Sequence, residues 1–159
     1  GPGRGKAYLQ TRSGVLRLAC RRVDAEELRA EIEEGLRAAR ENEPWHADMR
    51  FRAMRRLMEA APGDAEWPFE LAEAVSRAAL AWADILVAAR ESQRAVDALQ
   101  SSLRPAPLDE PLNKRLYRLL LDTRQSDRAS RHLREYADRL LEAGFSQDDV
   151  EVIREEFGK

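Results

Sequence analysis

The stretch that decides the fold occurs twice: residues 90–99 read RESQRAVDAL, and residues 124–133 read RQSDRASRHL. The offset is 34 residues, and five of the ten positions are identical. The preceding apolar positions align at the same offset, with these pairs: Ala83 and Tyr117, Ile85 and Leu119, Leu86 and Leu120. A chance match in a chain rich in Arg, Ala and Leu would not align the apolar positions as well. We therefore infer two copies of one structural unit.

A period of 34 residues is typical of the tetratricopeptide repeat, a helix–turn–helix unit that stacks on copies of itself. Ser92 and Ser126 are predicted to be the N-caps of the second helix in each unit. Ala95 and Ala129 are small and would let the two helices of a unit approach closely. Two units are too few for a self-standing array, so we expect other helices to cover them.

Composition sets the broad class of the protein. The chain has 159 residues and a net charge of −2, with charged residues of both signs, which argues against an overall basic surface for nucleic acid. No apolar run is long enough to span a membrane, and no secretory signal is visible. Cys20 is the single cysteine, so we expect no intrachain disulfide and a cytoplasmic location.

The N-terminal residues differ from the rest of the chain. Residues 1–6 begin with Gly-Pro-Gly, which is typical of an expression-tag remnant followed by a linker. A Gly-Lys pair in this linker is followed by Ala7, whereas a phosphate loop requires Ser or Thr there. Residues 7–22 are predicted to form a β-hairpin, with strands on either side of the turn-forming residues 11–14. We expect the natural protein to extend N-terminally, and residues 23–159 to form one helical domain.

The remaining sequence predicts about seven helices. Apolar periodicity and capping residues place them at 24–40, 44–61, 65–89, 92–103, 108–122, 126–143 and 146–157. Asp24 is predicted to cap the first of these helices. Trp45 and Met49 in the second helix, and Phe69 and Trp82 in the third, are expected to lie in the core. The predicted fold is all-α: a tetratricopeptide-like right-handed stack preceded by a short hairpin.

Residue patterns for catalysis or metal binding are absent from the sequence. His46 and His132 are the only histidines, and neither has a second His or Cys at metal-ligand spacing. There is no Gly-rich phosphate loop or nucleophile motif, so we expect no enzyme activity, no cofactor and no metal. One basic cluster could contact phosphate or could be an ordinary helix surface, which we favour: Arg50, Arg52, Arg55 and Arg56.

The chain resembles the bacterial transcriptional activator domain over residues 7–157. The resemblance is carried by a hairpin-like segment leading into Arg22-Val23-Asp24, Trp67 in an acidic stretch, Pro107-Leu108-Asp109-Glu110 between the repeats, and Arg128-Ala129, Tyr136 and Ala143-Gly144 in the last repeat. This family is the tetratricopeptide-like region that follows a winged-helix DNA-binding domain in antibiotic regulatory proteins. The resemblance implies that residues 7–22 form the junction with such a domain.

The chain departs from the family pattern at several positions. The glycine that usually precedes the second helix of each unit is replaced by Arg90 and Arg124, and the usual glycine of the first helix by Ala83 and Tyr117. Other departures are Pro62-Gly63-Asp64 between the second and third helices and Leu28 in place of an aromatic residue.

The resemblance implies a regulatory interaction domain of a DNA-binding transcription activator. Its partners would be its own winged-helix domain, RNA polymerase components or a second copy, with DNA contacted only through the winged helix. In such repeats the first helices line the binding face. Counting back from the repeat alanines places these residues there: Arg77, Leu80, Asp84, Val87, Lys114, Arg118 and Leu121.

Two other functions remain open from the sequence. The first is a generic tetratricopeptide-type protein–protein adaptor unrelated to transcription. The second is an accessory or sensing domain that holds a small molecule near Trp82 and Tyr117, although no polar constellation points to such a ligand.

Overall fold

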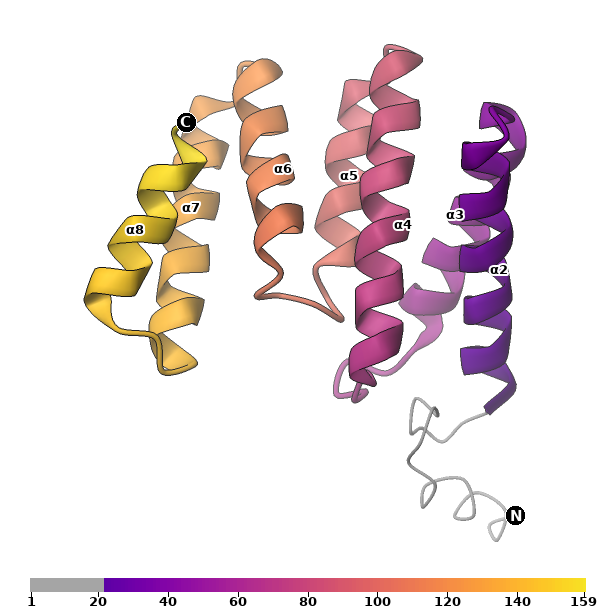
Figure 1. The fold of residues 1–159 in the computed structure, drawn as a ribbon, viewed down its shortest axis with the longest axis horizontal. Coiled ribbons are helices and arrows are strands. Elements are labelled where there is room, and N and C mark those ends of the chain that lie inside the picture. Colours follow the sequence, from indigo (N-terminus) through magenta and orange to yellow (C-terminus); the bar gives the residue numbers. More distant parts are fainter. Residues whose placement is uncertain (1–21) are drawn as a thin grey trace, which may run out of the picture.

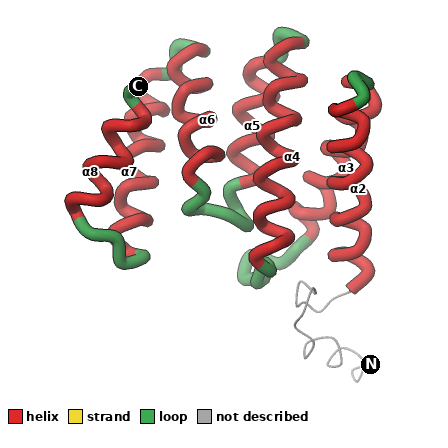
Figure 2. The backbone as a smooth tube through the Cα atoms, viewed as in Figure 1, coloured by secondary structure: helices red, strands yellow, loops and turns green. Residues whose placement is uncertain are grey.

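The computed structural model describes residues 22–159, and this part of the chain is all-helical with no strand (Figure 1). Its seven helices are α2 (Arg22–Arg40), α3 (Pro44–Ala60), α4 (Phe69–Ala88), α5 (Ser92–Ser102), α6 (Glu110–Asp122), α7 (Ser126–Glu142) and α8 (Gln147–Phe157). Loops join them end to end (Figure 2). The predicted hairpin, at Tyr8–Ala19, lies outside the described residues. No described helix is long and apolar enough to cross a membrane.

The helices pack as consecutive pairs. α2 packs on α3, α4 on α5, and α6 on α7, while α8 covers α7 and the adjoining side of α6. The first helices of the pairs also meet, α2 with α4 and α4 with α6, which joins the pairs into a row (Figure 1). The first residues of α2, α4 and α6 all lie along the same edge of this row, the lower edge in Figure 1. The three first helices therefore run in the same direction.

The same turn joins the two helices of every pair. A residue with positive φ follows each first helix: Asn42 at 59°, Arg90 at 63° and Arg124 at 62°. The next backbone N–H then donates to a carbonyl five residues back, each at 2.8 Å: Glu43 to Ala38, Glu91 to Leu86 and Gln125 to Leu120. This is the Schellman pattern of helix C-termini. The turn between α2 and α3 is thus a third copy of the turn found in the two sequence repeats.

The third copy escapes a search at a fixed period because the two helices between the turns at Asn42 and Arg90 are longer than those of the next interval. α3 has 17 residues and α5 has 11, while α4 has 20 and α6 has 13, so the turn at Asn42 precedes the turn at Arg90 by more than 34 residues. Counted from the turn, Gly35 takes the place of Ala83 and Tyr117, so the first-helix glycine that the sequence repeats lack is present here. Likewise, Ala47 takes the place of the repeat alanines, and all three alanines are fully buried: Ala47, Ala95 and Ala129.

The predicted N-caps of the second helices are wrong by one residue. Ser92 and Ser126 are the first residues of α5 and α7, and the N-caps are Glu91 and Gln125, neither of which makes a side-chain capping bond. The turn explains the difference of one residue, because the residue with positive φ, Arg90 or Arg124, is followed directly by the N-cap. Ser146, by contrast, caps α8 as predicted and accepts a hydrogen bond from the Asp149 N–H at 3.1 Å.

The turn also predicts a stabilising substitution. Arg90 and Arg124 adopt a left-handed conformation that destabilises the folded state for steric reasons and that glycine adopts freely. Arg90→Gly and Arg124→Gly are each expected to raise the free energy of unfolding by about 0.5–1 kcal/mol, after the entropy that glycine adds to the unfolded chain. Urea unfolding followed by circular dichroism measures this. Arg90→Ala is the control, since alanine keeps the Cβ, and an equal gain from alanine would contradict the explanation.

Other helix boundaries differ from the prediction. The helix expected from residue 65 begins at Phe69, with Pro68 as its N-cap, because proline is excluded from a helix interior and disfavours helix in the residue before it. α2 begins at Arg22, two residues before the predicted cap Asp24. α6 begins at Glu110 because Asp109 caps it, accepting the Leu112 N–H at 2.9 Å.

The core runs through all three pairs, but three predicted core residues lie outside it. Trp82 is buried as expected, whereas Trp45 is 71% exposed, Phe69 is 75% exposed and Met49 is also exposed. In α3 the inward face is instead formed by Ala47, Phe51, Met54 and Met58. That face is rotated away from Trp45 and Met49. The apolar side chains of Trp45 and Phe69 are thus available at the surface.

The arginine cluster of α3 forms ion pairs with acidic side chains. Arg50 lies 3.0 Å from Glu31 on α2. Arg52 and Arg55 pair along their own helix with Asp48 and Glu59, respectively, at 3.3 and 3.2 Å. An ion-paired helix surface, which we favoured, accounts for these three arginines without a phosphate ligand.

Candidate protein-binding face and its terminal pocket

The predicted face is built by α4 and α6, the first helices of two neighbouring pairs, which contact each other. Arg77, Asp84 and Leu121 are exposed, and the other four predicted residues are half-buried: Leu80, Val87, Lys114 and Arg118. Leu80 and Val87 also pack against the core. The structure therefore brings two helices that carry the predicted residues side by side, and leaves every predicted side chain at least partly accessible.

This face carries more positive than negative charge. Asp84 pairs across the two helices with Arg115, at 3.2 Å. Arg77, Lys114 and Arg118 have no ion-pair partner within residues 22–159. Arg115 was not predicted, although its position three residues before Arg118 puts both side chains on one side of α6 and could have suggested it. The α4–α6 face, meaning these five charged residues with the apolar ones between them, suits an acidic partner segment.

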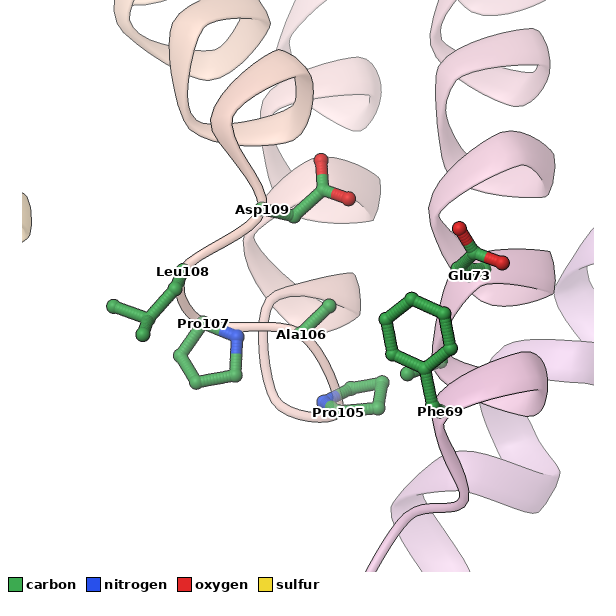
Figure 3. A pocket seen from close by; sticks show the side chains of 8 residues that line it. Phe69, Glu73, Pro105, Ala106, Pro107, Leu108 and Asp109 are labelled. Carbon is green, nitrogen blue, oxygen red and sulfur yellow. The ribbon is translucent and has the colours of Figure 1, made fainter. Parts of the chain in front are cut away.

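An apolar pocket lies at the start of this face (Figure 3). Its volume is about 360 Å³. One wall is the first turn of α4, with Phe69, Ala72 and Glu73, and the other is the α5–α6 loop, residues 105–109. In Figure 3 the Phe69 ring stands opposite Pro105 and Ala106. The large exposure of Phe69 is thus explained by its position on the wall of an open pocket.

Sequence reasoning missed this pocket, although a signal for it was present. Phe69, Glu73 and Arg77 are spaced by four residues and therefore lie along one side of α4. Extending the predicted face by two turns toward the start of α4 leads into the pocket. The prediction instead placed Phe69 in the core because it treated the apolar set of α4 as a single wide face.

Hydrogen bonds fix the α5–α6 loop that forms one wall of the pocket. The buried Asn113 amide donates to the carbonyls of Pro107 and Asp109, at 3.1 and 2.8 Å. The Tyr136 hydroxyl, whose pKa is raised to about 12 mainly by burial, donates to the Leu108 carbonyl at 3.2 Å. The loop is thus held by α6 and by α7.

The other end of the loop is held by α3. The Arg104 guanidinium donates to the Met58 carbonyl at 2.9 Å and to that of Ala61 at 2.6 Å, and it also bonds the Pro62 carbonyl. Because the loop is anchored to three helices, the pocket is formed before anything binds. The entropy lost by ordering the loop on binding is therefore small.

The two aromatic residues proposed to flank a small-molecule site are engaged in packing. Trp82 donates its indole N–H to Asp48 at 2.8 Å, and its ring contacts Phe51 with centroids 6.1 Å apart. Tyr117 contacts Phe157 of α8, with centroids 5.7 Å apart. Both rings therefore hold helices together at different places in the row.

Within residues 22–159, no three His, Cys, Asp or Glu side chains are grouped to hold a metal ion. Comparison with known proteins adds no family or neighbour. No protein-family model matches the chain, and no curated protein or solved structure does so either.

Proposed function

We propose that the described helices form a tetratricopeptide-like right-handed stack, and that this stack is the regulatory interaction domain of a bacterial DNA-binding transcription activator. The observation that carries the proposal is the turn shared by three consecutive helix pairs. A stack of such pairs presents its first helices on one side, where partner proteins bind.

The proposed mechanism uses the α4–α6 face as a docking surface. It would hold the winged-helix domain of its own chain, a component of RNA polymerase or a second copy. Arg77, Lys114 and Arg118 would meet acidic groups of that partner, which favours rapid and selective association. DNA would be read only by the winged helix, so these cations serve protein contact.

Reversing two charges on this face tests the proposal. Lys114→Glu combined with Arg118→Glu is expected to reduce activation of a reporter promoter by at least about tenfold, because like charges would then face each other. The measurement uses the natural full-length protein, with DNA binding determined in parallel. Both side chains are partly exposed and unpaired within the described residues, so the melting temperature should stay unchanged.

The matched control reverses two exposed arginines on α7, Arg131→Glu with Arg134→Glu, for the same change in net charge. Activation equal to that of the control would contradict the docking surface. A clear fall in melting temperature would show that Lys114 and Arg118 serve folding. A natural protein that contains no DNA-binding domain and activates no promoter would instead favour a generic adaptor, the alternative function.

A further inference from the structure

We propose that the apolar pocket between α4 and the α5–α6 loop is the docking site for residues 8–18 of the same chain. This assigns a second surface and an intramolecular ligand, and goes beyond the partner binding proposed for the α4–α6 face. The inference rests on three observations: the charge of the segment, the lining of the pocket and the place where α2 begins.

The charge of the N-terminal segment is opposite to that of the helical part. All 29 acidic residues of the chain lie in residues 22–159, and residues 1–21 contain none. Those first residues carry five cations, namely Arg4, Lys6, Arg12, Arg17 and Arg21. Apolar residues alternate with them, including Tyr8, Leu9, Val15, Leu16 and Leu18. The segment thus combines side chains for an apolar pocket with charges for an acidic rim.

The pocket offers the complementary arrangement. Its walls are mainly apolar, and Glu73 and Asp109 are its two charged lining residues. Glu70 and Glu110 adjoin the walls, next to Phe69 and Asp109 in the chain, and are exposed. Glu70 and Glu73 have no ion-pair partner within residues 22–159. An apolar side chain in the pocket would therefore place neighbouring arginines beside the Glu70 and Glu73 carboxylates, whose attraction adds to apolar burial.

The start of α2 places the segment within reach of the pocket. α2 contacts α4, and both helices begin at the lower edge of the row in Figure 1, as does α6 after the pocket loop. Arg22 therefore lies along the edge of the row that also holds the pocket, and residues 8–18 precede Arg22 by 4 to 14 residues. An extended chain spans about 3.3–3.6 Å per residue, so ten residues reach about 35 Å.

Paramagnetic relaxation in the full chain tests this inference. Because Cys20 is the single cysteine, a Cys20→Ser, Gly14→Cys chain accepts one nitroxide label within the segment. We expect the amide signals of Ala72, Glu73 and Ala106 to lose most of their intensity. Adding Glu70→Lys and Glu73→Lys should restore it, because these substitutions place like charges beside the arginines.

The matched control replaces two exposed acidic residues that do not line the pocket, at the end of α7 and on α8, by Glu142→Lys and Glu155→Lys, for the same change in net charge. Broadening that persists in the Glu70→Lys, Glu73→Lys chain, or that never reaches the pocket amides, would overturn the proposal. In a mixture of labelled and isotope-enriched unlabelled chains, broadening of the unlabelled chain would identify a second copy as the occupant and also overturn it. Since no DNA or RNA polymerase is present, the outcome is independent of the transcription proposal.

Discussion

Replacement of Asp48 by alanine is expected to lower the free energy of unfolding by about 2–4 kcal/mol, and the melting temperature by about 5–15 °C. The Asp48 side chain is only 15% exposed and joins three helices. It accepts the indole N–H of Trp82 on α4 at 2.8 Å and a guanidinium N–H of Arg94 on α5 at 3.0 Å. Asp48→Ala leaves the indole N–H of a buried tryptophan without an acceptor, which accounts for most of the loss.

Two control variants separate this hydrogen bond from the ion pairs. Asp48→Asn keeps an acceptor oxygen for Trp82 and removes the charge, so it should cost only about 1 kcal/mol, since its partners Arg52 and Arg94 are half-exposed and ion pairs to such groups contribute little. Asp84→Ala removes an exposed aspartate with one ion pair, to Arg115, and should change stability by less than about 0.5 kcal/mol. Thermal unfolding followed by circular dichroism ranks the three variants. A loss for Asp48→Ala no larger than that for Asp84→Ala would contradict this account.

Replacement of Gly35 by alanine is expected to destabilise the protein by about 1–3 kcal/mol, even though alanine favours helix over glycine by about 1 kcal/mol. A Cβ at this position would lie 2.5 Å from Cε1 and 2.7 Å from Cδ1 of Phe51. The Phe51 ring is fully buried and packs against Trp82, so it has little room to move aside. Gly35 thus sets how closely α2 and α3 approach.

A double-mutant cycle isolates this contact. Phe51→Leu alone should destabilise the core, but Gly35→Ala should cost less in its presence, which gives a favourable interaction energy above about 0.5 kcal/mol. Gly63→Ala is the control, because a Cβ there meets nothing within 4 Å. Strictly additive effects of Gly35→Ala and Phe51→Leu in urea unfolding would contradict the close contact.

The positions of the helices could be predicted from sequence because the residues that start and end a helix act locally. Pro44 in the first turn of α3 and Ser146 as the cap of α8 act through their own backbone neighbourhood. Burial of the repeat alanines was also predictable, since identical letters at a fixed offset place Ala95 and Ala129 at equivalent points. The helix starts at Phe69 and Glu110 were missed by a few residues, because neighbouring apolar residues extended the apparent pattern.

The third helix pair and the pocket could not be predicted in the same way. The turn at Asn42 shares geometry with those at Arg90 and Arg124 but not residue identity, and its offset differs. The pocket depends on a loop fixed by groups distant in sequence, such as Arg104 bonding α3 and Tyr136 bonding from α7. Such long-range bonds leave no periodic signal in the chain.

The proposed regulator has two binding surfaces of opposite charge. One face, between α4 and α6, carries cations that have no ion-pair partner within residues 22–159 and suit an acidic partner, and the pocket at its start is apolar with an acidic rim. Opposite electrostatic character at the two places would let one domain hold its own N-terminal segment and a separate partner together. We propose that this stack belongs to a DNA-binding transcription activator.

Reading the coding sequence that precedes Gly3 in the source genome tests most directly whether the helices belong to a transcription activator. We predict a winged-helix domain in the same reading frame, immediately before the segment that leads into α2. A different kind of domain, or a start codon directly before that segment, would contradict the transcription proposal and leave a helical-repeat adaptor.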